Sequence, residues 1–141
     1  MLIVVGYAPR PESRAALDVA VTEARRRGAR LHLVRTLGQG PSDNPSQTRQ
    51  WADKVQQVSD EIREVAEQLG TEGLEVTYDV EPVSTAAAQH LLDVANRLEA
   101  DLIVIGLRRR SAVGKLVMGS VSQEILLGAE CPVLAVKAPE D

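Results

Sequence analysis

Phenylalanine is absent from this 141-residue chain, which also has only one tryptophan and two tyrosines. Few aromatic rings are therefore available to stack on nucleic-acid bases. Acidic residues number 20 against 16 lysines and arginines, so the chain has no basic excess with which to coat a phosphate backbone. We expect no nucleic-acid partner.

Cysteine and long apolar runs are equally scarce. The single cysteine, Cys131, excludes an intrachain disulfide framework and fits a reducing cytosol. No apolar run approaches the length of about 20 residues that a membrane span needs, and the N-terminus lacks the basic region of a secretion signal. No Cys/His spacing typical of a metal site occurs, and His32 and His90 are expected to be packed or surface residues. These absences predict a cytoplasmic protein with no membrane partner and no metal-ligating residues, and leave open whether a metal accompanies a bound nucleotide.

Apolar segments that are present alternate between two periodicities. Short apolar runs at residues 2–5, 31–36, 102–105 and 133–136 are typical of buried strands, and the alternating pattern at 74–80 indicates a half-exposed edge strand. Helical spacing of apolar residues lies between them, at 17–24, 51–69, 88–98 and 121–126. Strands that alternate with helices predict an α/β fold with a doubly wound parallel sheet, in a single domain over residues 1–141.

Small polar residues and glycines indicate where these helices begin and end. Gly28 is expected to end the first helix, and Gly70 is expected to end the second. Residues 37–47, between these two helices, are expected to form a loop. Ser84 is expected to cap the third helix. Ser120, with Gln123 three residues later, has the pattern of a capping box for the fourth helix.

A basic loop with spaced glycines follows the strand at 102–105. Free N–H groups and the dipole of the next helix favour an anion at such a place. Arg108, Arg109, Arg110 and Lys115 add positive charge to this loop. The P-loop pattern and the Gly-x-Gly-x-x-Gly pattern are both absent, so the loop belongs to neither class.

The loop resembles the nucleotide-binding loop of the universal stress protein family, Gly-x2-Gly-x9-Gly-Ser/Thr. Gly106 matches the first glycine, and Gly119 and Ser120 match the closing pair, whereas Arg109 stands where the second glycine is usual. The resemblance covers nearly the whole chain. It implies a Rossmann-like, five-stranded parallel sheet of order 3-2-1-4-5 with helices on both faces.

The same resemblance implies a nucleotide site between the ends of the first and fourth strands. Val34 would pack near an adenine base, and residues 119–122 would hold phosphates beside Arg108. ATP-binding members usually carry Asp where this chain has Ala8, so that contact with the ribose is missing. The expected nucleotide-binding residues are Gly6, Ala8, Val34, Ile105, Gly106, Arg108, Arg109, Gly119, Ser120, Val121 and Ser122.

Three functions remain open from the sequence. The first is a regulatory, adenine-nucleotide (ATP)-binding protein of the stress response, with weak and salt-sensitive binding. The second is a homodimeric module of the family that binds no nucleotide and acts through protein partners. The third, an enzyme, ranks last because no carboxylate is expected near the loop, so we assign no catalytic residue and expect very slow ATP hydrolysis at most.

The fifth strand is expected to form a dimer interface. Val133, Leu134, Ala135 and Val136 are apolar on both faces of a strand that the family order places at the sheet edge. Such an edge favours pairing with another chain. The prediction is a symmetric homodimer, as the resemblance also implies.

Overall fold

In the computed structural model, the described residues are 1–37, 44–81, 86–108 and 118–138. Within them, strands and helices alternate along the chain as the apolar periodicity predicts. The elements are β1 (Leu2–Gly6), α1 (Pro11–Arg27), β2 (Arg30–Thr36), α2 (Pro45–Thr71), β3 (Val76–Glu81), α3 (Ala87–Arg97), β4 (Leu102–Leu107), α4 (Ser120–Gly128) and β5 (Val133–Lys137).

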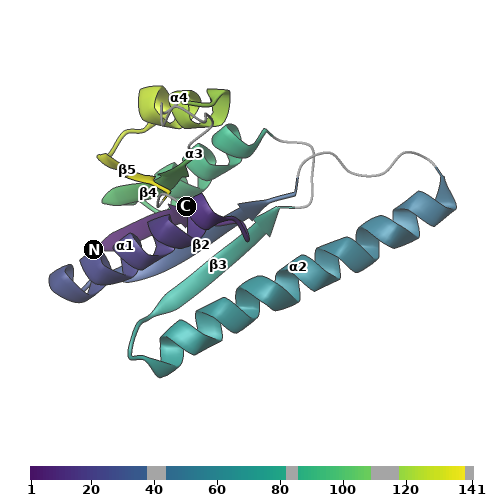
Figure 1. The fold of residues 1–141 in the computed structure, drawn as a ribbon, viewed down its shortest axis with the longest axis horizontal. Helices are drawn as coiled ribbons and strands as arrows, with labels where there is room; N and C mark the ends of the chain where they lie inside the picture. The colour runs from purple at the N-terminus through teal and green to yellow at the C-terminus, as the bar shows by residue number, and fades with distance from the viewer. Residues whose placement is uncertain (38–43, 82–85, 109–117, 139–141) are drawn as a thin grey trace.

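The strands form one parallel sheet of order β3-β2-β1-β4-β5, which confirms the predicted topology (Figure 1). In the centre of the sheet, Val4 lies opposite both His32 of β2 and Ile103 of β4. The winding therefore reverses between β1 and β4. In open parallel sheets this is where ligands bind, beyond the carboxyl ends of the strands.

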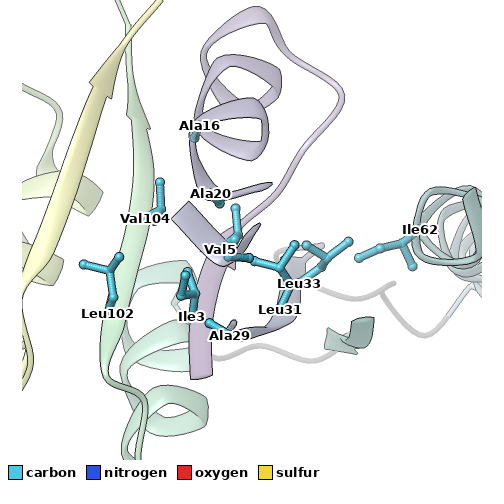
Figure 2. Close-up of a cluster of buried hydrophobic side chains, with 11 residues drawn as sticks. Ile3, Val5, Ala16, Ala20, Ala29, Leu31, Leu33, Ile62, Leu102 and Val104 are labelled. Carbon is cyan, nitrogen blue, oxygen red and sulfur yellow. The ribbon is translucent and has the colours of Figure 1, made fainter. Parts of the chain in front are cut away.

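Helices α1 and α2 cover one face of the sheet, and α3 and α4 cover the other (Figure 1). Alternate residues of each strand supply the two cores: Ile3 and Val5 pack beneath α1, whereas Leu2 and Val4 pack beneath α3. Figure 2 shows the first core, where Ile62 reaches from α2 toward the strands. The central strands are thus buried on both sides, which explains their continuous apolar runs.

Helix boundaries follow the predictions only in part. Gly28 adopts the left-handed conformation (φ 63°) after α1, as predicted for a C-cap. By contrast, α2 begins at Pro45, inside the segment expected to be a loop, because the side chain of Asn44 accepts a hydrogen bond from the Ser46 N–H. The helix also continues through Gly70 to Thr71, so Gly70 does not end it.

Both predicted edge strands lie at the edges of the sheet. In β5, Val133 and Ala135 pack toward α3 and α4, and Val136 packs against the core beneath α1. Leu134 has 36% of its surface exposed. No helix of the described chain is long and apolar enough to cross a membrane.

Candidate functional site

A cavity of about 500 Å³ opens at the carboxyl ends of β1, β2 and β4. Its walls come from the β1–α1 turn, the end of β2, the N-terminus of α3, the end of β4 and the N-terminus of α4. The cavity therefore occupies the switch point of the sheet, where the side-chain and backbone groups of five elements can reach one ligand.

Ten of the residues expected to bind nucleotide line this one cavity. They are Gly6, Ala8, Val34, Ile105, Gly106, Arg108, Gly119, Ser120, Val121 and Ser122. Arg109, Arg110 and Lys115 lie outside the described residues. The geometry brings the expected set together from strands far apart in sequence.

The N-termini of α1, α3 and α4 all meet this cavity, and none is capped by the side chain of its own N-cap residue. The capping prediction for Ser120 is wrong: Gly119 occupies the N-cap position, and Ser120 is the first helical residue. The Gln123 N–H bonds to the Gly119 carbonyl, so the first free amides of α4 belong to residues 120–122. Ser84 lies outside the described residues, and the N-cap position of α3 is Ala86.

Uncapped helix ends leave backbone N–H groups without intrahelical acceptors. Each end also carries about half a positive charge from the aligned peptide dipoles. Three such ends around one cavity create a field that favours an anion over a neutral ligand.

Side chains strengthen this positive field. Arg10, Arg35 and Arg108 line the cavity, and Glu12 is the one carboxylate among its described lining residues. The Arg108 Nε lies 3.2 Å from Glu12 Oε1. The expectation that no carboxylate lies near the loop is therefore wrong, because Glu12 of α1 reaches the same cavity as Ser120.

Burial at the end of β2 lowers the pKa of Arg35, and the like charge of Arg10 lowers it further. Glu61 and Tyr7 oppose this shift. The guanidinium stays protonated in proteins, so the shift records an unfavourable environment for the charge. A bound anion would relieve that cost.

Two glycines of the resemblance have different physical roles. A Cβ atom on Gly106 would lie 2.1 Å from the Glu12 backbone oxygen, so glycine is needed there for α1 to approach the end of β4. A Cβ atom on Gly119 would meet no atom of the described residues within 4 Å. Gly106 therefore has a packing role that the motif alone does not reveal.

One of the two histidines contacts a residue of the cavity. Both are buried, as expected for packed residues. His90 of α3 is hydrogen-bonded through Nδ1 to the hydroxyl of Thr36, which lines the cavity. His32 Nδ1 lies 2.6 Å from Thr77 Oγ1. Within the described ranges, no group of three or more His, Cys, Asp or Glu side chains could hold a metal ion.

Sequence reasoning missed Arg10, Glu12, Ser13, Arg35 and Thr36 as residues of the cavity. A signal was available, because each lies at the carboxyl end of a buried strand or in the first turn of the next helix. The ends of neighbouring parallel strands share one edge of the sheet, so polar residues there converge. A single-carboxylate, arginine-rich cavity is suited to binding an anion.

Comparison with known proteins gives a consistent result. The sequence profile of the Universal stress protein family matches residues 1–137. A universal stress protein of Mycolicibacterium smegmatis is 36% identical over 137 residues, which cover 96% of this chain and 97% of the relative.

Solved structures share the fold. The universal stress protein of Archaeoglobus fulgidus in complex with dAMP superposes with a TM-score of 0.61 at 22% identity, over 97% of this chain and 98% of the other. A universal stress protein in complex with cAMP gives a TM-score of 0.71 at 20% identity, over 99% and 98% of the two chains.

Proposed function

Because this chain belongs to the universal stress protein family, we propose that it is a regulatory protein that binds an adenine nucleotide in the cavity at the switch point. Two proteins of the same fold were solved with dAMP and with cAMP, which supports this class of ligand. ATP is included in the class, since the free amides at the α4 N-terminus and the arginines of the cavity can bind the phosphates of any adenine nucleotide.

The observation that carries the proposal is the meeting of three uncapped helix N-termini at one arginine-lined cavity. Phosphates are the ligand groups that best match free backbone amides and guanidinium groups together. We assign the phosphates to the amides of residues 119–122, with Arg108 beside them.

Apolar side chains also line the cavity. Val34, Leu91, Ile105 and Ile125 are buried and line it. A purine base could bury its faces there, and a cavity of about 500 Å³ is within the range of small-molecule sites. Ala8 offers the ribose no hydrogen bond from its side chain, so recognition depends mainly on the phosphates and is sensitive to salt.

Regulation, rather than catalysis, fits the charges of the cavity. Glu12 is held by Arg108, and no second carboxylate lines the described wall. Phosphoryl transfer needs groups that position a metal ion and the attacking nucleophile. We therefore propose that ATP is bound and hydrolysed very slowly at most.

The direct test is to denature the purified protein and identify any released nucleotide by mass spectrometry. We expect an adenine nucleotide from the wild type and much less from Gly119→Asp. Aspartate is a favourable N-cap that fits the open space at Gly119, so it preserves folding but repels phosphate. Gly119→Ala is the matched control. If wild-type protein freed of any bound nucleotide also bound no ATP, AMP or cAMP in solution, the nucleotide-free function would replace this proposal.

We also propose a symmetric homodimer formed through β5. Leu134 is exposed on this edge strand, and Leu127 of the neighbouring α4 has 89% of its surface exposed. An unpaired strand edge beside exposed leucines favours association with a second copy. This assembly is compatible with nucleotide binding and is also what the nucleotide-free alternative would require.

A further inference from the structure

We propose that Arg10 and Arg35 form a second anion subsite on the β2 side of the cavity, with Ser13 of α1 on the adjoining wall, and that the ligand is an adenine nucleotide with an additional phosphate on its ribose. This inference rests on the proposed function, because it assumes that a nucleotide occupies the cavity. It adds a specificity that separates this chain from a general binder of AMP or ATP.

The arginines of the cavity come from two sides of the sheet. Arg35 belongs to β2, and Arg10 immediately precedes α1. Arg108 and the α4 N-terminus lie instead beyond β4. Strand β1 separates β2 from β4, so the two sides of the cavity are about 10 Å apart. The 5′-phosphate of a nucleotide and a second phosphate on its ribose could therefore occupy different sides of the cavity.

Arg10 and Arg35 also differ from Arg108 in their partners. Within the described residues, no hydrogen bond or ion pair holds the guanidinium of Arg10 or that of Arg35. Arg108, in the same cavity, is paired with Glu12, and Arg97 is paired with Asp79. Arg35 is half-buried and feels the like charge of Arg10. Two guanidinium groups that repel each other in a cavity are poised for a ligand with negative charge.

Ser13 supplies an independent observation. Only 9% of this residue is exposed, it lines the cavity, and no hydrogen bond joins its hydroxyl to another described residue. Ser13 is the third residue of α1, so its amide and that of Glu12 are also free of intrahelical acceptors. A hydroxyl without a protein partner at the wall of the cavity is available to donate to a ligand. The subsite therefore offers two cations, a hydroxyl and a helix N-terminus.

The side chains near the proposed ribose position favour a phosphate on the ribose over a free hydroxyl. In dinucleotide-binding folds, a carboxylate recognises the free ribose hydroxyl, and an arginine accommodates a ribose phosphate. Here Ala8 provides no carboxylate, and Arg10 lies two residues later. Planar guanidinium groups bind phosphate in a bidentate manner. The cavity thus fits a ribose that carries a phosphate at its 2′ or 3′ position.

Titration calorimetry with AMP, adenosine 2′,5′-bisphosphate and adenosine 3′,5′-bisphosphate tests the inference at one fixed ionic strength. We expect one of the bisphosphates to bind roughly 10- to 100-fold more tightly than AMP, as for one or two charge-assisted hydrogen bonds. Arg35→Gln and Arg10→Gln should each reduce this ratio toward one. Arg35→Lys should keep part of it, and Arg14→Gln, on the exposed side of α1, should leave it unchanged.

The outcomes separate the two proposals. Equal affinity for AMP and both bisphosphates would overturn the subsite and leave the proposed function intact. A preference for a bisphosphate that survives in Arg10→Gln, whose side chain is exposed and whose loss should not disturb folding, would also overturn it. Binding of inorganic phosphate alone, with no gain from adenosine, would overturn both, as would no binding of any of these ligands.

Discussion

Arg108, which follows β4, donates from Nε to the carboxylate of Glu12 in the first turn of α1, across a distance of 3.2 Å. The side chain of Glu12 is 13% exposed, whereas that of Arg108 is 47% exposed. The ion pair joins two walls of the cavity and occupies the arginine that would otherwise face the phosphates. Glu12 therefore competes with an anionic ligand for Arg108.

This competition predicts that Glu12→Gln tightens nucleotide binding. The substitution frees Arg108 and removes the negative charge from the cavity, so the affinity for ATP should rise about two- to fivefold, the scale of a partly exposed ion pair. Calorimetry on the variant measures the change. Glu23→Gln, which breaks an ion pair with Arg27 far from the cavity, is the control. Weaker binding in Glu12→Gln would mean that Glu12 holds the ligand itself.

Gly106→Ala should destabilise the fold, because the added Cβ would meet the Glu12 backbone oxygen at 2.1 Å. Neither backbone can move without displacing α1 or β4, so we expect a cost of about 3 kcal/mol, the upper end for overpacking. Gly119→Ala, which adds the same methyl group in open space, should cost less than about 1 kcal/mol. Urea unfolding of both variants gives the comparison. Equal stability of the two would show that α1 does not need the close approach at Gly106.

His32 should make stability depend on pH. Burial lowers the pKa of His32 below its ordinary 6.5, and the nearby charges of Arg97 and His90 lower it too, although Asp79 opposes the shift. The folded state therefore favours the neutral ring. Stability from this group is fully present above the unfolded pKa and is lost as the pH falls below it, by at most about 1.4 kcal/mol per pH unit.

Urea unfolding at pH 7.5 and at pH 5.5 checks this sign. The wild type should lose more stability on acidification than His32→Asn, which cannot take up the proton. Any acid-dependent loss common to both proteins belongs to other groups. An equal loss in the two proteins would exclude His32 as the source.

Leu134→Glu should convert the proposed homodimer into a monomer, because a charge would be buried at the paired β5 edge. Light scattering measures the mass. Leu98→Glu is the matched control, since Leu98 at the end of α3 has the same 36% exposure but does not belong to the sheet. Val136→Glu is unsuitable, because Val136 packs against the core. A wild-type protein of monomer mass would contradict the assembly.

Apolar periodicity was sufficient to predict the strands and most of the helices. The continuous runs in β1 and β4 reflect burial on both faces, and the alternation around Val76 and Val80 reflects an edge strand that is covered on one side. The strand order came from the resemblance, because periodicity does not specify which strands are neighbours.

Sequence patterns predicted the first residues of the helices and the residues of the cavity less well than they predicted the strands. Asn44 begins α2 inside a polar segment that looked like a loop, and Gly119 rather than Ser120 occupies the N-cap of α4. Glu12 and Arg35 were missed although they follow buried strands, because no motif of the resemblance includes those positions. Gly106 was interpreted as a phosphate-binding glycine, yet the close approach of α1 is by itself enough to require a residue without a Cβ atom there.

The central claim is that the positive field of the cavity binds a nucleotide through its phosphates, and calorimetry with ATP and with adenosine at two salt concentrations tests it most directly. We expect ATP to bind, its affinity to fall markedly as salt rises, and adenosine to bind far more weakly at both concentrations. Equal, salt-insensitive binding of ATP and adenosine would contradict the account, as would the absence of ATP binding at low salt.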